Sequence, residues 1–295
     1  VELIPAAVYL LAARTIPESP RFLVSLDRVG EARDVLRSVG QDLDDGQLAE
    51  MRRQMAGEEQ QSLRDLRGPR FGLLPVVWIG ITLSVLQQFV GINVIFYYSS
   101  VLWQAVGFDE SDSLQISVIS GAINIAATIV AIACIDRFGR RPLLLLGSAG
   151  MSVSLVVLAY LFGTAPLVEV AATSTCAAPC LQPTLSGSSA TLALVAANLF
   201  VIFFGFSWGP VVWVLLGEMF PNRIRAVALS VAAAAQWLAN FLVSTTFPPL
   251  AASGLGLAYG IYAFFAIVSL VLVWRVVRET KGRSLEDMES TYAAA

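Results

Sequence analysis

The chain has 295 residues, of which 56% are hydrophobic and only 14% are charged, with a net charge of −3 and a mean hydropathy of +0.71. These values indicate a membrane protein and exclude an ordinary soluble domain. The sequence contains no histidine, which excludes histidine-based triads and most zinc sites. It also shows no activated nucleophile and no phosphate-binding glycine loop. We therefore expect neither an enzyme nor a cofactor, and no nucleic-acid partner.

The first element is a short apolar stretch from Leu3 to Ala13. A bilayer core of about 30 Å needs roughly 20 helical residues, so this stretch is about half a crossing. We interpret it as the end of a helix that begins upstream. No signal peptide is visible, because the first residues lack a basic region and a small-residue cleavage site.

Residues 27–67 form a soluble-looking block in which apolar residues recur at helical spacing among many charges. This pattern predicts short amphipathic helices on the membrane surface. The alternative is a solvated linker of fraying helices. Neither interpretation gives the block a catalytic role.

Six longer apolar stretches follow, each near or above the length needed to cross a membrane. They lie at residues 72–101, 114–135, 143–163, 191–217, 226–247 and 255–274. If these spans alternate in direction, all 19 basic residues fall on one side of the membrane, and the opposite loops carry only acidic charges. By the positive-inside rule, residues 14–70 and the C-terminus are then cytoplasmic.

The first long span carries three amides near its centre, Gln87, Gln88 and Asn93, and no charged residue. An unpaired amide is costly inside a bilayer. Such side chains therefore either join neighbouring helices or face a polar cavity. Amides both donate to and accept from hydroxyl groups, and three consecutive aromatic residues follow at 96–98. The combination suits a polar, neutral, ring-shaped ligand such as a sugar.

Glycine and proline residues occur between and within the later spans. In the motif DRFGRRP (136–142), Gly139 permits a tight turn and Pro142 suits the first turn of the next helix. In the fourth span, Gly205 and Pro210 weaken the helix, and broken membrane helices are tolerated where they line a cavity.

The outer loop at 164–190 is rich in Ser, Thr, Ala and Pro, and we expect it to be a flexible excursion. Its Cys176 and Cys180 either form a disulfide in an oxidising exterior or stay unpaired, because their spacing does not fix the geometry.

Six motifs occur in a characteristic order. They read PESPRFL (17–23), QQFVGINVIFYYS (87–99), GAIN (121–124), DRFGRRP (136–142), FGFSWGPVVWVLLGEMFPNRIR (204–225) and RETKGRSLEDME (278–289). Together they resemble the sugar porter family of the major facilitator superfamily, which includes facilitative glucose transporters and proton–sugar symporters. One departure is Arg278, where the family usually has proline.

The resemblance implies an all-α membrane fold, namely the C-terminal six-helix bundle of the superfamily with a small cytoplasmic helical linker domain. Its parts would be the end of transmembrane helix 6 at 1–14, the linker domain at 15–71, the bundle at 72–277 and a cytoplasmic tail at 278–295. The implied partners are a monosaccharide, the lipid bilayer of the plasma membrane and a missing N-terminal six-helix bundle.

The resemblance also implies roles for individual residues, because indole faces pack on pyranose rings and amides bind their hydroxyls. The implied substrate-binding residues are Gln87, Gln88, Asn93, Asn124, Trp208, Trp213 and Asn240. Tyr97 and Tyr98 are either an outer gate or anchors near the membrane interface. The implied cytoplasmic salt-bridge network, which would hold the inner ends of the bundles together, consists of Glu18, Arg21, Asp136, Arg137, Arg140, Arg141, Glu218, Arg225 and Glu279.

The function that the resemblance implies is hexose or pentose transport by alternating access. No acidic residue lies deep in the spans, so a proton-coupling carboxylate would lie in the missing half, and symport and facilitated diffusion both remain open. The motif FSWGP is closer to symporter-type members and favours proton-coupled symport. Further hypotheses are a non-transporting sugar sensor, a truncated half-transporter and a carrier for another polyol or small metabolite.

Overall fold

The computed structural model describes residues 3–38, 46, 61–68, 72–105, 108–170 and 180–282. The chain divides into two compact units, residues 1–61 and 62–295. Each unit has buried apolar residues of its own.

The described part of the first unit contains the helices α1 (Leu3–Thr15), α2 (Pro20–Ser25) and α3 (Val29–Ser38). Proline begins α2, where its missing N–H costs no helical hydrogen bond. The helices α2 and α3 bury a small core of Leu23, Val24 and Ala32. The helix α3 corresponds to the first part of the predicted amphipathic block, whereas most of residues 39–60 lie outside the described residues.

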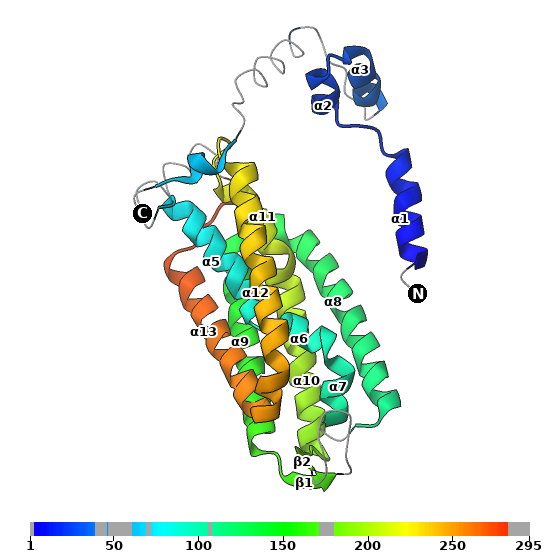
Figure 1. The fold of residues 1–295 in the computed structure, drawn as a ribbon, viewed down its shortest axis with the longest axis vertical. Coiled ribbons are helices and arrows are strands. Elements are labelled where there is room, and N and C mark those ends of the chain that lie inside the picture. The colour runs from blue at the N-terminus through cyan, green and yellow to red at the C-terminus, as the bar shows by residue number, and fades with distance from the viewer. Residues whose placement is uncertain are drawn as a thin grey trace. The chain divides into compact units, whose positions relative to one another are not determined.

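The second unit is a bundle of long helices, with the two short strands at one end (Figure 1). Among the described residues, six helical spans are long and apolar enough to cross a membrane, which confirms the six predicted spans. In chain order the elements are η1 (Leu63–Leu66), α5 (Pro75–Phe89), α6 (Ile92–Tyr97), α7 (Ser99–Ala105), α8 (Glu110–Phe138), α9 (Arg140–Thr164), β1 (Leu167–Val170), β2 (Cys180–Pro183), α10 (Ser188–Phe203), η2 (Phe204–Trp208), α11 (Gly209–Met219), α12 (Arg225–Ser253) and α13 (Leu255–Arg275).

Small residues bring the helices of this bundle close together. A Cβ on Gly256 of α13 would lie 2.6 Å from the Cα of Gly163 in α9. A Cβ on Gly147 of α9 would overlap the hydroxyl of Ser207 in η2. In lipid, where apolar burial gives little drive for association, such close backbone packing stabilises helix pairs. The helix α9 therefore holds both α13 and the irregular segment η2 in place.

The first long span is interrupted, whereas the sequence predicts one helix over 72–101. The helix α5 ends at Phe89, α6 begins after Gly91, and α7 begins at Ser99. Gly91 has a φ of +84°, a left-handed conformation that glycine adopts without the penalty of a Cβ. The fourth span contains the single-turn π-helix η2 around Gly205, in agreement with the predicted weakening of that helix.

The described residues of the outer loop at 164–190 include a short antiparallel strand pair, which the sequence did not predict. Strands β1 and β2 pair with Leu167 opposite Pro183 and Val170 opposite Cys180. Cys176 and the side chain of Cys180 lie outside the described residues, so the disulfide stays a prediction.

Candidate functional site

Two of the predicted amides meet across the break at Gly91. Gln88 lies at the end of α5 and Asn93 at the start of α6. The amide nitrogen Nδ2 of Asn93 donates a hydrogen bond of 2.5 Å to Oε1 of Gln88. Gln88 is buried and Asn93 is half-buried. The left-handed glycine thus turns two amides from consecutive helices toward each other.

The third amide of this span joins α5 to the π-helix η2. The nitrogen Nε2 of Gln87 donates to the backbone carbonyl of Trp208 at 2.7 Å and to that of Gly209 at 3.3 Å. A π-helical turn disturbs the regular carbonyl ladder of the helix and frequently marks a functional site. The oxygen Oε1 of Gln87 is buried and has no hydrogen-bond partner among the described residues. Gln87 therefore connects two helix irregularities near the middle of the bundle.

Asn124 faces η2 from the neighbouring helix α8. A Cβ on Gly205 would lie 2.6 Å from Oδ1 of Asn124, so the absence of a side chain at Gly205 makes room for this amide. The hydroxyl of Thr128 donates to the backbone oxygen of Asn124 at 2.8 Å. The structure thus places Asn124 beside the π-helix that also holds Gln87.

A row of polar residues along one face of α8 was not identified from the sequence. Ser117 donates to Ser99 of α7 at 2.7 Å, and Ser120 donates to Asn198 of α10 at 3.0 Å. The signal that could have revealed this face is the spacing of three or four residues between successive polar residues. Its members are Ser113, Ser117, Ser120, Asn124 and Thr128. Hydrogen bonds from this face join α8 to α7 and α10 on the side of the helix that carries Asn124.

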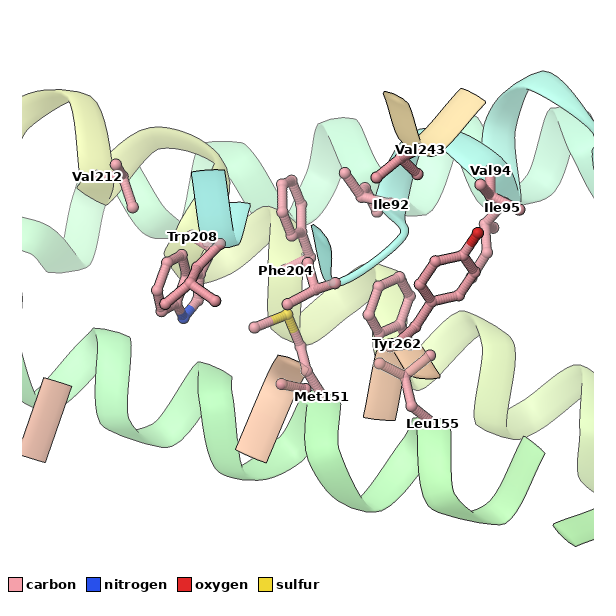
Figure 2. Packing of buried hydrophobic residues seen from close by; sticks show 14 of the residues in the cluster. Ile92, Val94, Ile95, Met151, Leu155, Phe204, Trp208, Val212, Val243 and Tyr262 are labelled. Carbon is pink, nitrogen blue, oxygen red and sulfur yellow. The ribbon is translucent and has the colours of Figure 1, made fainter. Parts of the chain in front are cut away.

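The two predicted tryptophans lie in different surroundings. Trp208 is fully buried within the apolar core (Figure 2), and its Nε1 donates to the hydroxyl of Ser148 at 2.8 Å. Ser148 also accepts from Ser269 of α13 at 3.2 Å. Trp213 lies on α11 and is exposed. In this conformation the side chain of Trp213 is therefore partly accessible, whereas Trp208 joins η2 to α9.

Asn240 and Tyr98 are linked through one residue of α12. The hydroxyl of Tyr98 donates to the backbone carbonyl of Ser244 at 3.0 Å, and the hydroxyl of Ser244 donates to Oδ1 of Asn240 at 3.1 Å. The ring of Tyr98 also packs against Phe247. Tyr97 is exposed. The two tyrosines therefore lie in different surroundings, because breaks in the chain interrupt the single helix predicted over 72–101.

A cluster of charged residues lies around the start of α9, at the end of the bundle opposite the two strands. The guanidinium nitrogen Nη2 of Arg140 lies 2.6 Å from Oε1 of Glu218 and 2.9 Å from Oδ1 of Asp136. The residue is almost fully buried. Arg225, in contrast, donates to the backbone carbonyl of Phe220. Glu218 therefore pairs with Arg140 and not with Arg225, and the structure joins the ends of α8, α9 and α11.

Glu279 caps the start of α9. Its two carboxylate oxygens accept from the backbone N–H groups of Arg140 at 2.9 Å and Arg141 at 3.0 Å. The first N–H groups of a helix lack partners in the helix and favour negative charge. A Cβ on Gly139 would lie 2.6 Å from Oε2 of Glu279, and Gly139 has a φ of +92°. Gly139 thus serves both the turn and the carboxylate, and the segment after α13 is tied to α9.

The remaining members of the predicted network are dispersed. Arg141 donates to the backbone carbonyl of Trp274 at 2.8 Å, and the backbone oxygen of Arg137 accepts from Lys281 at 2.7 Å. Glu18 is exposed in the first unit, and the side chain of Arg21 lies outside the described part of the chain. The structure therefore describes the network within the second unit.

The capping role of Glu279 predicts a pH dependence of stability. Burial raises the pKa of Glu279, but backbone N–H groups of residues 281, 140, 141 and 280 outweigh it and hold the pKa below its ordinary value. The ionised form therefore stabilises the fold above the unfolded pKa of about 4.3, and this contribution is lost as the pH falls through the lower folded value.

We expect the stability of the wild type to fall more steeply below about pH 4 than that of Glu279→Gln, which cannot lose a charge there. Unfolding midpoints recorded between pH 3 and 7 measure the difference. Parallel curves for the two proteins would contradict the capping role.

Six described helical spans that are long and apolar enough to cross a membrane, with uncharged amides at two helix irregularities, define an α-helical membrane protein with polar residues inside its bundle. Residues 1–292 match the family model described as "Sugar (and other) transporter", and the chain belongs to this family, the sugar porters of the major facilitator superfamily. The family consists of transporters and not enzymes, which confirms that part of the sequence interpretation.

Two relatives and one solved structure show how far the likeness extends. The chain is 54% identical over 289 residues to a glucose transport protein of Synechocystis sp., covering 97% of this chain and 59% of that protein. It is 36% identical over 300 residues to the D-xylose-proton symporter of Escherichia coli K12, covering 99% and 56%. The structure of a proton:xylose symporter bound to 6-bromo-6-deoxy-D-glucose matches with a TM-score of 0.74 and 35% identity, covering 99% of this chain and 57% of that one. The chain thus spans less than three fifths of the length of these relatives.

Proposed function

We propose that the chain forms one half of a carrier that moves a hexose or pentose across the plasma membrane by alternating access. The observation that carries the proposal is the amide pair Gln88–Asn93 at the break in the first long span. Sugars present several hydroxyls that both donate and accept, and amides match this pattern without adding a charge to the membrane interior.

The other predicted site residues are assigned to the same function. Asn124 lies beside the π-helix that holds Gln87, and Asn240 is linked to Tyr98 through Ser244. Trp213 offers an exposed indole on which a pyranose ring can pack. We assign Trp208 a supporting role in this conformation, because its ring is buried and its N–H is bonded to Ser148.

The transporting unit in this proposal contains a second six-helix bundle. Support comes from the relatives, of which the chain covers 59%, 56% and 57%. The charged cluster around Arg140 belongs to the cytoplasmic face, since all basic residues of the chain fall on one side if the spans alternate. The plasma membrane location and this orientation are parts of the proposal.

We propose proton-coupled symport as the energy source, supported by the likeness to a D-xylose-proton symporter. Facilitated diffusion is the second candidate, and it is favoured by the absence of any acidic residue from the middle of the described spans. In the symport version, the coupling carboxylate belongs to the other bundle.

Uptake by the full-length protein in proteoliposomes tests the proposal. We expect accumulation of labelled glucose or xylose that is driven by an inward proton gradient and abolished by a protonophore. Equilibration without accumulation would establish facilitated diffusion instead. Sugar binding without uptake would establish a sensor, and uptake of inositol or an organic acid in place of both sugars would contradict the assigned substrate class.

A further inference from the structure

An aromatic ring of α13 lies directly against the glycine that breaks the first long span. A Cβ on Gly91 would lie 2.7 Å from Cδ2 and 2.8 Å from Cγ of Tyr262. Two independent features therefore require glycine here, namely the φ of +84° and the tyrosine ring that occupies the space of a side chain. Tyr262 belongs to the same buried cluster as Ile92 and Ile95 of α6 (Figure 2).

The ring of Tyr262 is itself held by other rings. It packs edge to face on Tyr259, with ring centroids 6.1 Å apart, and Tyr259 packs on Phe162 of α9 at 5.0 Å. This row of rings runs from α9 through α13 to Gly91. Because α9 and α13 also touch backbone to backbone at Gly163 and Gly256, the row rests on a rigid helix pair.

The hydroxyl of Tyr262 contributes no visible bond. It is buried and has no hydrogen-bond partner among the described residues. A buried hydroxyl without a partner costs free energy, so the contribution of this residue to the break comes from the ring and its packing.

We infer that Tyr262 is a positioning residue for the sugar-binding amides: its ring fixes the geometry of the break at Gly91 and thereby the alignment of Gln88 with Asn93. Gly91 lies between these amides, and their hydrogen bond spans the break. The backbone N–H groups of Val94 and Ile95 both donate to the carbonyl of Gly91, so a displaced Gly91 would displace the first turn of α6. The inference rests on the proposed sugar site, because the amides are the groups whose alignment matters there.

The experiment compares Tyr262→Leu with two other variants in the full-length protein. Tyr262→Phe keeps the ring and removes the hydroxyl. Phe200→Leu removes a fully buried ring of α10 and controls for a general loss of packing. The three variants and the wild type are measured for glucose and xylose affinity, alone and in an Asn93→Ala background. Backbone hydrogen exchange is followed in residues 91–98.

For Tyr262→Leu we expect a roughly tenfold weaker sugar affinity and a roughly tenfold faster exchange in residues 91–98. In Tyr262→Phe, the sugar affinity and the exchange rate should both stay within about twofold of the wild type. In the Asn93→Ala background, Tyr262→Leu should have no further effect on affinity, because the effects of two substitutions are not additive when one residue acts through the other.

Three results would overturn the inference, and the first two are unchanged exchange in residues 91–98 of Tyr262→Leu and an equal affinity loss with and without Asn93. An equal change in Phe200→Leu would also overturn it, because general loosening would then explain the effect. Absence of sugar binding by the wild type would contradict the proposed function, whereas hydrogen exchange would still decide whether the ring fixes the break.

Discussion

Replacing both Gln88 and Asn93 with alanine should weaken sugar binding roughly 30- to 1,000-fold, equivalent to about 2–4 kcal/mol. The two amides lie together at the break and bond to each other. Their removal takes away donors and acceptors that match the sugar hydroxyls at buried and half-buried positions, where a polar group left without a partner is costly. The loss should therefore exceed that expected for a single exposed hydrogen bond.

Equilibrium binding of glucose and xylose to the full-length protein measures this effect. Asn198→Ala is the matched control, because it removes an amide that is bonded to Ser120 and to the backbone carbonyl of Leu194. We expect the control to bind sugar as the wild type does, apart from any loss of stability. Unchanged affinity in the double variant, in a protein with wild-type unfolding behaviour, would show that the substrate site lies elsewhere.

The span positions could be predicted from the sequence, because membrane crossing imposes a length and an apolar composition that a single chain reveals. The turn at Gly139 was also predictable, and the structure places it directly before α9. The close approach of Gly139 to the carboxylate of Glu279 was not predictable. The contact between Gly139 and Glu279 joins residues far apart in the chain, and local spacing carries no information about such contacts.

The sequence offers candidate site residues by type, but it does not give their geometry. An ideal helix places Tyr98 near the stripe that contains Gln87, whereas the left-handed Gly91 ends that helix and carries Tyr98 to Ser244 of α12. Tryptophan is a residue type that can stack on a ligand. In this structure, however, the indole of Trp208 is buried and bonded to Ser148 of α9, a contact that the sequence alone does not reveal. Such assignments need the tertiary arrangement, since the same side chain stacks on a ligand or fills a core.

The pairing of the charged residues shows the same limit. Glu218 and Arg225 are close in the sequence and share a motif, yet Glu218 bonds to Arg140 of α9. Only the meeting of α9 with the end of α11 makes this pair possible. The resemblance names Glu218 and Arg140 as members of one network, whereas their direct pairing depends on the tertiary arrangement.

Replacing Arg140 with methionine should lower the free energy of unfolding by about 2–3 kcal/mol, because it leaves the partly buried carboxylate of Glu218 without its guanidinium partner. The residue also donates from Nη1 to the backbone carbonyl of Ile135 at 3.3 Å, and this bond is lost too. Arg225→Met is the control. It removes a guanidinium that bonds to the carbonyl of Phe220 and should cost about 1 kcal/mol.

The double variant Arg140→Met with Glu218→Gln separates the cost of an orphaned charge from the loss of packing. Removing one partner of a buried ion pair costs more than removing both, since the second change abolishes the uncompensated charge. We expect the double variant to recover most of the loss, with a coupling of about 1–3 kcal/mol between the two positions. Chemical unfolding of the purified full-length protein and its variants in detergent measures each corner of this cycle. Strictly additive losses would mean that Arg140 stabilises the bundle through its contacts with Ile135 and Asp136, and that the ion pair with Glu218 contributes nothing to holding α9 and α11 together.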